Sequence, residues 1–167
     1  MDLSKKERLS LVNQFLILEK LYPEEADYFE QHRIALQQGF QLHYKWIFEN
    51  IWEDFPEDEC KKVLDALDLY RGIVSSFDAL QDKDGLTESE IRFPGFDGNN
   101  ESHHLSYTRY FVVDLDRYEE LIRNQEYPDF NSHCPMLEKY VRMSSVWQSW
   151  GRPHNMTAAK LRELLEA

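Results

Sequence analysis

The chain has 167 residues, of which 42% are hydrophobic and 14% aromatic, which is enough apolar material to build a core and too much for an intrinsically disordered protein. Its formal net charge of −12 disfavours binding to nucleic acid and to anionic membrane surfaces. The start lacks an apolar leader and no run of about 18 apolar residues occurs, so we expect no membrane span and a cytoplasmic location.

The first predicted helix begins at Ser4, because Ser4 and Glu7 have the spacing of a capping box. It ends near Tyr22 and Pro23, and a second helix follows to about Gly39. Apolar residues of the first helix cover a stripe wider than one contact requires, so we expect neighbours on two sides. These residues are Leu9, Leu11, Val12, Phe15, Leu16 and Leu18.

The segment 40–54 is dense in aromatic residues and predicts another helix, although its spacing also permits an extended conformation. The clearest element follows Pro56, where apolar residues recur at steps of three and four as far as Phe77. We therefore predict a long helix that ends before the turn at Asp82 to Gly85.

A structured loop is expected near residues 82–99, and it contains a second capping box from Thr87 to Glu90. Helical spacing resumes over 101–113, a short helix is plausible over 117–124, and a polar connection covers 125–132.

After Pro135, apolar residues alternate at steps of four and three, which is typical of a helix that packs against one partner. This helix ends at Gly151 to Pro153, and Thr157 caps a terminal helix. Strand patterns are nearly absent. The sequence thus predicts an all-α fold, an irregular bundle of about eight helices in a single domain over 1–167.

Three segments carry a family resemblance: Phe93–Asp97, Tyr107–Phe111 and Pro135–Tyr140. Together with the order of the elements, they resemble the YfbU family over essentially the whole chain. The resemblance implies a helical, bacterial, cytosolic protein. It supplies no activity, and no catalytic residues can be carried over from it.

Two cysteines, Cys60 and Cys134, lie far apart and match no metal-binding spacing, so we expect reduced, buried thiols and no disulfide. Adjacent His103 and His104 point about 100° apart on a helix and are poorly placed to chelate one metal. The turn at Asp82 to Gly85 is out of register for a calcium loop. We therefore predict no metal site and no cofactor.

A candidate ligand site consists of Asp97, His104, Arg109 and Asp114. Arg109 lies among aromatic residues, where a buried guanidinium needs a carboxylate or a ring as partner, and Asp97 is the natural carboxylate. The pair either pins the loop at 94–98 onto the following helix, which we favour, or binds an anionic ligand.

Four tryptophans and nine tyrosines exceed what a core of this size must hold, and aromatic residues and methionine are enriched at the centres of interfaces. The candidate interface residues are Trp46, Trp52, Met136, Tyr140, Met143, Trp147 and Trp150. The alternative, equally weighted, is that these residues face each other inside one monomer. The leading hypothesis is a non-enzymatic, homo-oligomeric interaction or regulatory module. The competing hypothesis is an enzyme or small-ligand-binding protein that uses the cluster at 97–116.

Overall fold

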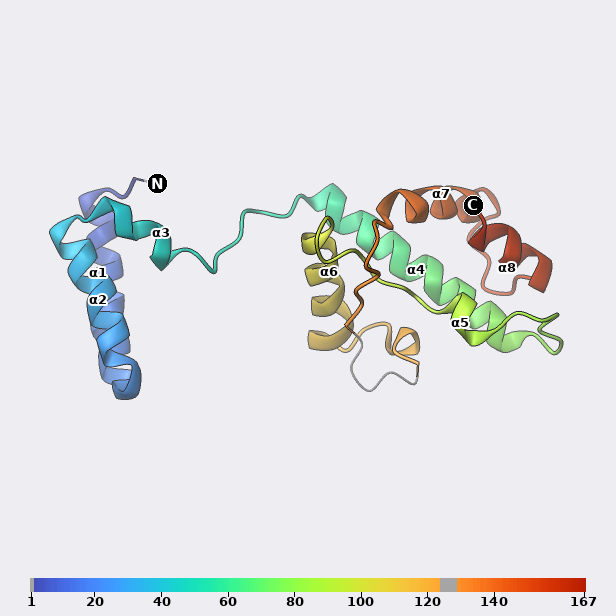
Figure 1. Ribbon diagram of the computed structural model, residues 1–167, viewed down its shortest axis with the longest axis horizontal. Coiled ribbons are helices and arrows are strands. Elements are labelled where there is room, and N and C mark those ends of the chain that lie inside the picture. Colours follow the sequence, from blue (N-terminus) through green and yellow to red (C-terminus); the bar gives the residue numbers. More distant parts are fainter. Residues whose placement is uncertain (1, 124–128) are drawn as a thin grey trace. The chain divides into compact units, whose positions relative to one another are not determined.

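A computed structural model describes residues 2–123 and 129–167 (Figure 1). Within these residues the fold is all-α, with eight α-helices and no strand beyond an isolated bridge, as the sequence predicts. The α-helices are α1 (Lys5–Leu21), α2 (Ala26–Gln38), α3 (Tyr44–Ile47), α4 (Glu57–Ala79), α5 (Glu88–Ile91), α6 (Ser102–Arg109), α7 (Leu137–Ser149) and α8 (Ala158–Leu165).

The chain divides into two compact units, Met1–Asp54 (unit 1) and Phe55–Ala167 (unit 2). Each unit has its own cluster of buried hydrophobic residues. The prediction of one domain over the whole chain stays a prediction.

Unit 1 is a hairpin of α1 and α2, which pack along each other (Figure 1). The predicted capping box is present: the Ser4 hydroxyl accepts a hydrogen bond from the Glu7 amide, and the Glu7 carboxylate accepts one from the Ser4 amide. A 3-10 turn at Pro23–Glu25 joins the helices, and α2 ends at Gly39 in the left-handed conformation. The small core of this unit consists of Val12, Leu36 and Tyr44.

The prediction of a helix over 40–54 is wrong for most of this segment. A 3-10 turn at Gln41–His43 leads into the four-residue α3, and no helix continues beyond Ile47. Leu42, Ile51 and Trp52 are exposed, so the segment lacks the packed apolar face that stabilises most protein helices.

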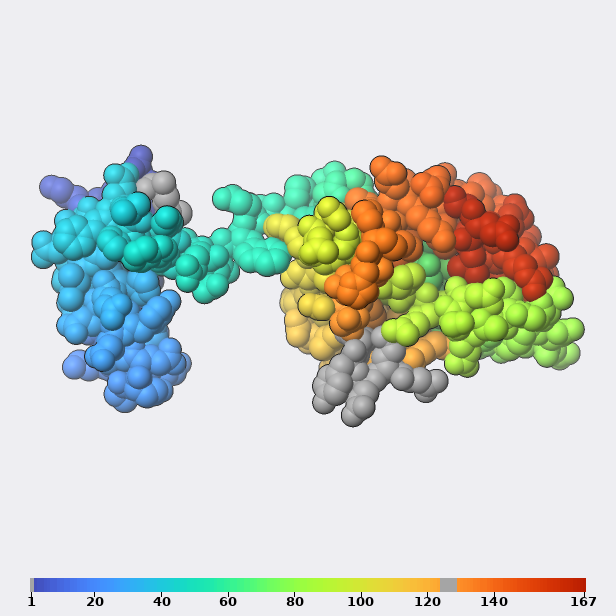
Figure 2. Space-filling model, in the orientation of Figure 1, coloured from blue at the N-terminus to red at the C-terminus, as the bar shows by residue number. Residues whose placement is uncertain are grey.

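Unit 2 is built around α4, which contacts α5, α6, α7 and α8. The predicted length of α4 is confirmed, and its buried residues include Val63, Leu67 and Tyr70. On the face shown in Figure 2, segments that follow α4 in the sequence cover most of it. The apolar stripe of α4 is therefore the centre of the unit 2 core.

The helix predicted over 101–113 has two parts. Helix α6 is regular to Arg109, and a π-helical turn continues it from Tyr110 to Asp114. The predicted short helix over 117–124 is only a 3-10 turn at Glu119–Leu121 in the part that the structure describes. Residue 124 of this predicted helix and residues 125–128 of the predicted polar connection lie outside the described residues.

Two loops cross each other in unit 2, where Phe96 and Asn131 form an isolated parallel bridge. The Phe96 amide donates to the Phe130 carbonyl at 2.9 Å, and the Ser132 amide donates to the Phe96 carbonyl at 3.2 Å. Gly95 makes this crossing possible: a Cβ there would lie 1.8 Å from the Phe130 carbonyl oxygen, and its φ is +88°. The structured loop predicted near 82–99 thus contains the second capping box, at Thr87 and Glu90, and ends at this crossing.

Candidate functional site

The aromatic face of α7 lies inside unit 2. Tyr140, Met143 and Trp147 are at most 2% exposed, and Met136 and Trp150 are partly buried against the same core. The Tyr140 hydroxyl donates to the Gly95 carbonyl at 2.7 Å. This face packs on α4 and belongs to the unit 2 core, so these α7 residues are not available as an exposed contact surface. Their partner is α4 and not the aromatic segment that contains Trp46 and Trp52.

Tight packing fixes Trp147 against α4. A Cβ at Gly72 would lie 2.8 Å from the Trp147 ring, so only glycine lets the indole approach α4 this closely. The indole Nε1 donates to the Pro153 carbonyl at 2.9 Å, which satisfies its polar atom. Trp147 is therefore a fully paired core residue.

Trp46 and Trp52, the other two predicted interface tryptophans, are 45% and 56% exposed. They belong to a larger set that we call the unit 1 apolar surface: Leu9, Leu16, Ile17, Leu21, Tyr22, Tyr28, Ile34, Phe40, Leu42, Trp46, Ile51 and Trp52. In the described part of the chain these are twelve of the sixteen exposed large hydrophobic residues. Exposed apolar side chains thus concentrate in the smaller unit.

A shallow groove of about 340 Å³ interrupts this surface, and its walls include Ile34, Phe40, His43 and Trp46. His32 also lines it. Its Nε2 atom is buried without a hydrogen-bond partner among the described residues, and its ring lies 5.6 Å from the Phe15 ring and 4.5 Å from the Tyr28 ring. Burial lowers the pKa of His32, while the charge of Glu49 opposes this shift.

The predicted pair between Asp97 and Arg109 does not form. Asp97 is buried, and its carboxylate instead accepts hydrogen bonds from the Asn100 side chain and from the Asn99 amide, which lower its pKa. Arg109 is exposed, and its Nε donates to the Asp129 carbonyl at 2.8 Å. Asp97 therefore stabilises the loop that contains Asn99 and Asn100, and Arg109 stabilises the separate loop that contains Asp129.

His104 and Asp114 have different surroundings again. The His104 Nε2 lies 2.9 Å from a Glu59 carboxylate oxygen, and the other Glu59 oxygen accepts a hydrogen bond from Lys62 at 2.5 Å. The bond from Lys62 first, and then the bond to His104, lower the pKa of Glu59. Asp114 is exposed and is the last residue of the π-helical turn. The four predicted ligand residues have no hydrogen-bond partner in common.

The most connected carboxylate is Glu101, which the sequence analysis did not select. Glu101 is 7% exposed, and its oxygens accept hydrogen bonds from the backbone amides of Asp97 at 2.9 Å, Met136 at 2.9 Å and Leu137 at 2.8 Å. The last two amides open α7, so a residue from a distant loop caps this helix. The N-cap residue of α7 is Met136, whose side chain does not cap the helix. The absence of a local cap in the sequence is the signal that a distant residue has to supply one.

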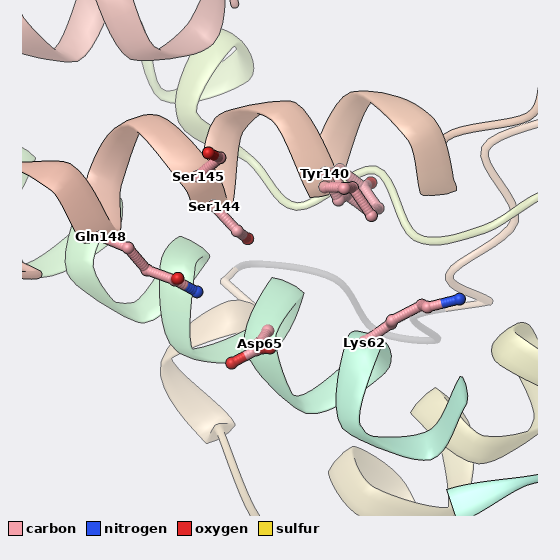
Figure 3. Close-up of a pocket in the computed structure, with 7 residues that line it drawn as sticks. Lys62, Asp65, Tyr140, Ser144, Ser145 and Gln148 are labelled. Atoms are coloured by element: carbon pink, nitrogen blue, oxygen red, sulfur yellow. The ribbon is translucent and has the colours of Figure 1, made fainter. Parts of the chain in front are cut away.

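A second pocket, of about 260 Å³, lies between α4 and α7 (Figure 3). We call it the α4–α7 pocket, and its lining residues are Lys62, Asp65, Tyr140, Val141, Ser144, Ser145 and Gln148. Its lining includes the buried Tyr140 and Ser144 of α7 and the charged Lys62 and Asp65 of α4. The pocket therefore combines apolar surface with several polar groups, as small-molecule sites do.

Both cysteines are free, as predicted, but they are less buried than expected: Cys60 is half-buried and Cys134 is exposed. Over 2–123 and 129–167, no group of three or more His, Cys, Asp or Glu side chains is placed to hold a metal ion. None of the helices within these described residues is both long enough and apolar enough to cross a membrane.

Comparison with known families gives a match over the full length. The family model described as the YfbU domain matches residues 1–167, the extent that the resemblance of the three sequence segments suggests. The chain therefore belongs to the YfbU family.

Proposed function

We propose that the protein is a self-associating interaction module in which unit 1 provides the contact surface between two copies. The observation that carries this proposal is α1, which is apolar on more than one side. Leu11, Val12 and Phe15 belong to or pack against the unit 1 core, whereas Leu9, Leu16 and Ile17 are 61%, 41% and 58% exposed. An apolar stripe wider than one contact requires is normally covered by a second neighbour.

The size of the unit 1 core supports the proposal. Among residues 2–54, the buried hydrophobic side chains are Val12, Ala35, Leu36 and Tyr44. A helical hairpin of about this size buries too little apolar surface to be stable alone. Association that covered Leu9, Leu16 and Ile17 would contribute roughly 1.5–3 kcal/mol for each fully buried side chain, less the cost of association.

A second copy is the partner that best complements this surface. Unit 2 exposes only four large hydrophobic residues in its described part, whereas a second copy of unit 1 offers the same twelve that this surface contains. A two-fold contact brings the same apolar residues from both copies. In an antiparallel pair of α1 helices, Lys5 and Lys6 at one end would approach Glu24 and Glu25, which follow the other end.

Light scattering after size-exclusion chromatography of the full chain tests the proposal. The wild-type chain should elute as a dimer or larger species that dissociates on dilution, and Leu16→Glu should be monomeric at the same concentration. Val113→Glu is the matched control, because Val113 is exposed to a similar extent in unit 2. A monomeric wild-type chain, or equal effects of the two substitutions, would contradict the proposal.

Charge reversal tests the antiparallel arrangement. Lys5→Glu with Lys6→Glu should weaken association, and so should Glu24→Lys with Glu25→Lys in a separate chain. All four substitutions together should restore association towards the wild-type level, because both ends of the contact are then reversed. If the fourfold variant does not associate but Leu16→Glu still abolishes association, the antiparallel pairing is rejected. The apolar surface of unit 1 would then still be the contact.

A further inference from the structure

The α4–α7 pocket contains a hydroxyl group that keeps its hydrogen-bonding capacity. Ser144 is 6% exposed, and no other described residue forms a hydrogen bond with its hydroxyl group. By contrast, the buried Ser76 hydroxyl donates to the Gly72 carbonyl at 2.7 Å and accepts from the Met156 amide at 3.0 Å. The Ser144 hydroxyl is therefore free to donate to, or accept from, a polar group that enters the pocket.

Opposite charges lie beside this hydroxyl. Lys62 and Asp65 are three residues apart on α4, so their side chains lie on the same face of the helix. Figure 3 shows Ser144 pointing from α7 towards α4, with Asp65 across from it and Lys62 at the Tyr140 end of the pocket. The Gln148 amide lies at the other end.

Both charges keep free bonding capacity. One ammonium hydrogen of Lys62 is used by Glu59, and two donors remain. The nearest cation to Asp65 is Arg152, at 3.5 Å between Nη2 and the carboxylate oxygen, which is long for a charge-assisted hydrogen bond. A ligand can therefore bond to each of these side chains without breaking a strong internal bond.

The charge pattern selects the class of ligand. The net charge of −12 repels a simple anion, and Lys62 repels a simple cation from the same pocket. A molecule with both an ammonium and a carboxylate group satisfies both side chains and adds no net charge. Apolar surface at the exposed Val141 accommodates a short aliphatic portion.

We propose that the α4–α7 pocket binds a small aminocarboxylate, with its ammonium group on Asp65 and Ser144 and its carboxylate on Lys62. The ligand donates to the Asp65 carboxylate and the Ser144 oxygen and accepts from the Lys62 ammonium. Its aliphatic part lies against Val141, which lines the same pocket and is exposed. The site belongs to unit 2 and does not depend on the self-association of unit 1.

Titration of the ¹⁵N-labelled full chain, followed by amide chemical shifts, tests the site. The probes are L-leucine, 6-aminohexanoate, and the two halves of leucine, 3-methylbutylamine and 4-methylpentanoate. Saturable shifts confined to α4 and α7 are expected with L-leucine or 6-aminohexanoate. Either half of leucine should bind with an affinity at least tenfold lower. Tighter binding of L-leucine identifies an α-amino acid as the ligand type, and tighter binding of 6-aminohexanoate identifies an ω-amino acid.

Three substitutions separate the roles of the side chains. Asp65→Asn and Lys62→Met should each weaken binding about tenfold or more, and Ser144→Ala about fivefold. Lys61→Met is the matched control, because Lys61 pairs with Glu57 and does not line the pocket, and it should bind as the wild type does. Far-ultraviolet circular dichroism establishes that each variant is folded.

The proposal is overturned if neither aminocarboxylate gives saturable shifts, or if a half-molecule binds as tightly as the whole. It is also overturned if folded Asp65→Asn and Ser144→Ala chains bind with wild-type affinity. These outcomes leave the proposed function unaffected, because that proposal rests on light scattering and on substitutions in α1.

Discussion

The two units of the chain use apolar residues in opposite ways. Among residues 2–123 and 129–167, unit 2 buries 23 hydrophobic side chains in one core around α4, whereas unit 1 exposes twelve large ones around a core of three. The hydrophobic content of the whole chain is an average over these two patterns. The contrast teaches that excess apolar surface in a chain can be concentrated in one part of it, and that this part is where a partner is expected.

The largest effect is expected in unit 2, at Gly95. Gly95→Ala should lower the free energy of unfolding by about 4 kcal/mol or more, because the added Cβ collides with the backbone of Phe130. Gly151→Ala is the control: its φ is also positive, at +82°, but no atom lies within 4 Å of the added carbon. It should cost only about 1–2 kcal/mol for the left-handed conformation. Urea unfolding measured by tryptophan fluorescence distinguishes the two, and equal losses would refute the steric explanation.

A pair of leucine substitutions compares the two units directly. Leu67→Ala removes a fully buried side chain of α4 and should destabilise unit 2 by about 2–5 kcal/mol at every protein concentration. Leu16→Ala removes a side chain that is 41% exposed, so its effect should be small in dilute protein and should grow with concentration as association contributes to stability. Thermal unfolding over a hundredfold range of concentration measures both. A concentration-independent loss at Leu16 would mean that it stabilises unit 1 from within.

The remote cap of α7 should have an intermediate effect. Glu101→Gln replaces a carboxylate that accepts from three backbone amides with an amide that has one acceptor oxygen, so we expect a loss of about 1–3 kcal/mol. Glu163→Gln makes the same chemical change at an exposed residue of α8 and should be nearly neutral. Hydrogen exchange at the first amides of α7 should accelerate in Glu101→Gln alone. Unchanged exchange there would show that the cap contributes little.

The smallest expected effect is a pH dependence in unit 1. The pKa of His32 is lower in the folded chain than its ordinary value near 6.5, so the unfolded state binds more protons and the stability of unit 1 falls as pH drops through about 6.5. The change should be on the order of 1 kcal/mol or less. Hydrogen exchange of α1 and α2 amides at pH 7.5 and 5.5 measures it. His32→Leu should remove this dependence, His154→Gln should retain it, and a dependence that persists in His32→Leu would assign it to another group.

Local sequence signals predict most of the fold, because they report short-range chemistry. The capping boxes at Ser4 and Thr87 and the stripe of α4 each involve residues within one or two turns, and the structure confirms all three. The prediction fails over 40–54, where aromatic composition suggested a helix without a packing partner to stabilise it.

Residues that act over long sequence distances could not be predicted in the same way. The periodicity of α7 establishes that one face is apolar, but α4 rather than a second subunit covers that face, and periodicity cannot distinguish the two. Proximity in sequence predicts a pair of Asp97 and Arg109, whereas Arg109 bonds to a residue 20 positions away. The α4–α7 pocket combines side chains from two helices that only the tertiary fold brings together.

Glu101 also has a consequence for how the length of this chain can vary. Its bond to the Leu137 amide joins residues 36 positions apart, so one side chain closes the segment between them as a reversible cross-link. The entropy of closing a flexible loop grows only with the logarithm of its length, and doubling the loop costs about 0.6 kcal/mol. The segment between the two ends also contains α6, the π-helical turn and the bridge at Asn131, so this small cost applies only to insertions in the connections outside these elements.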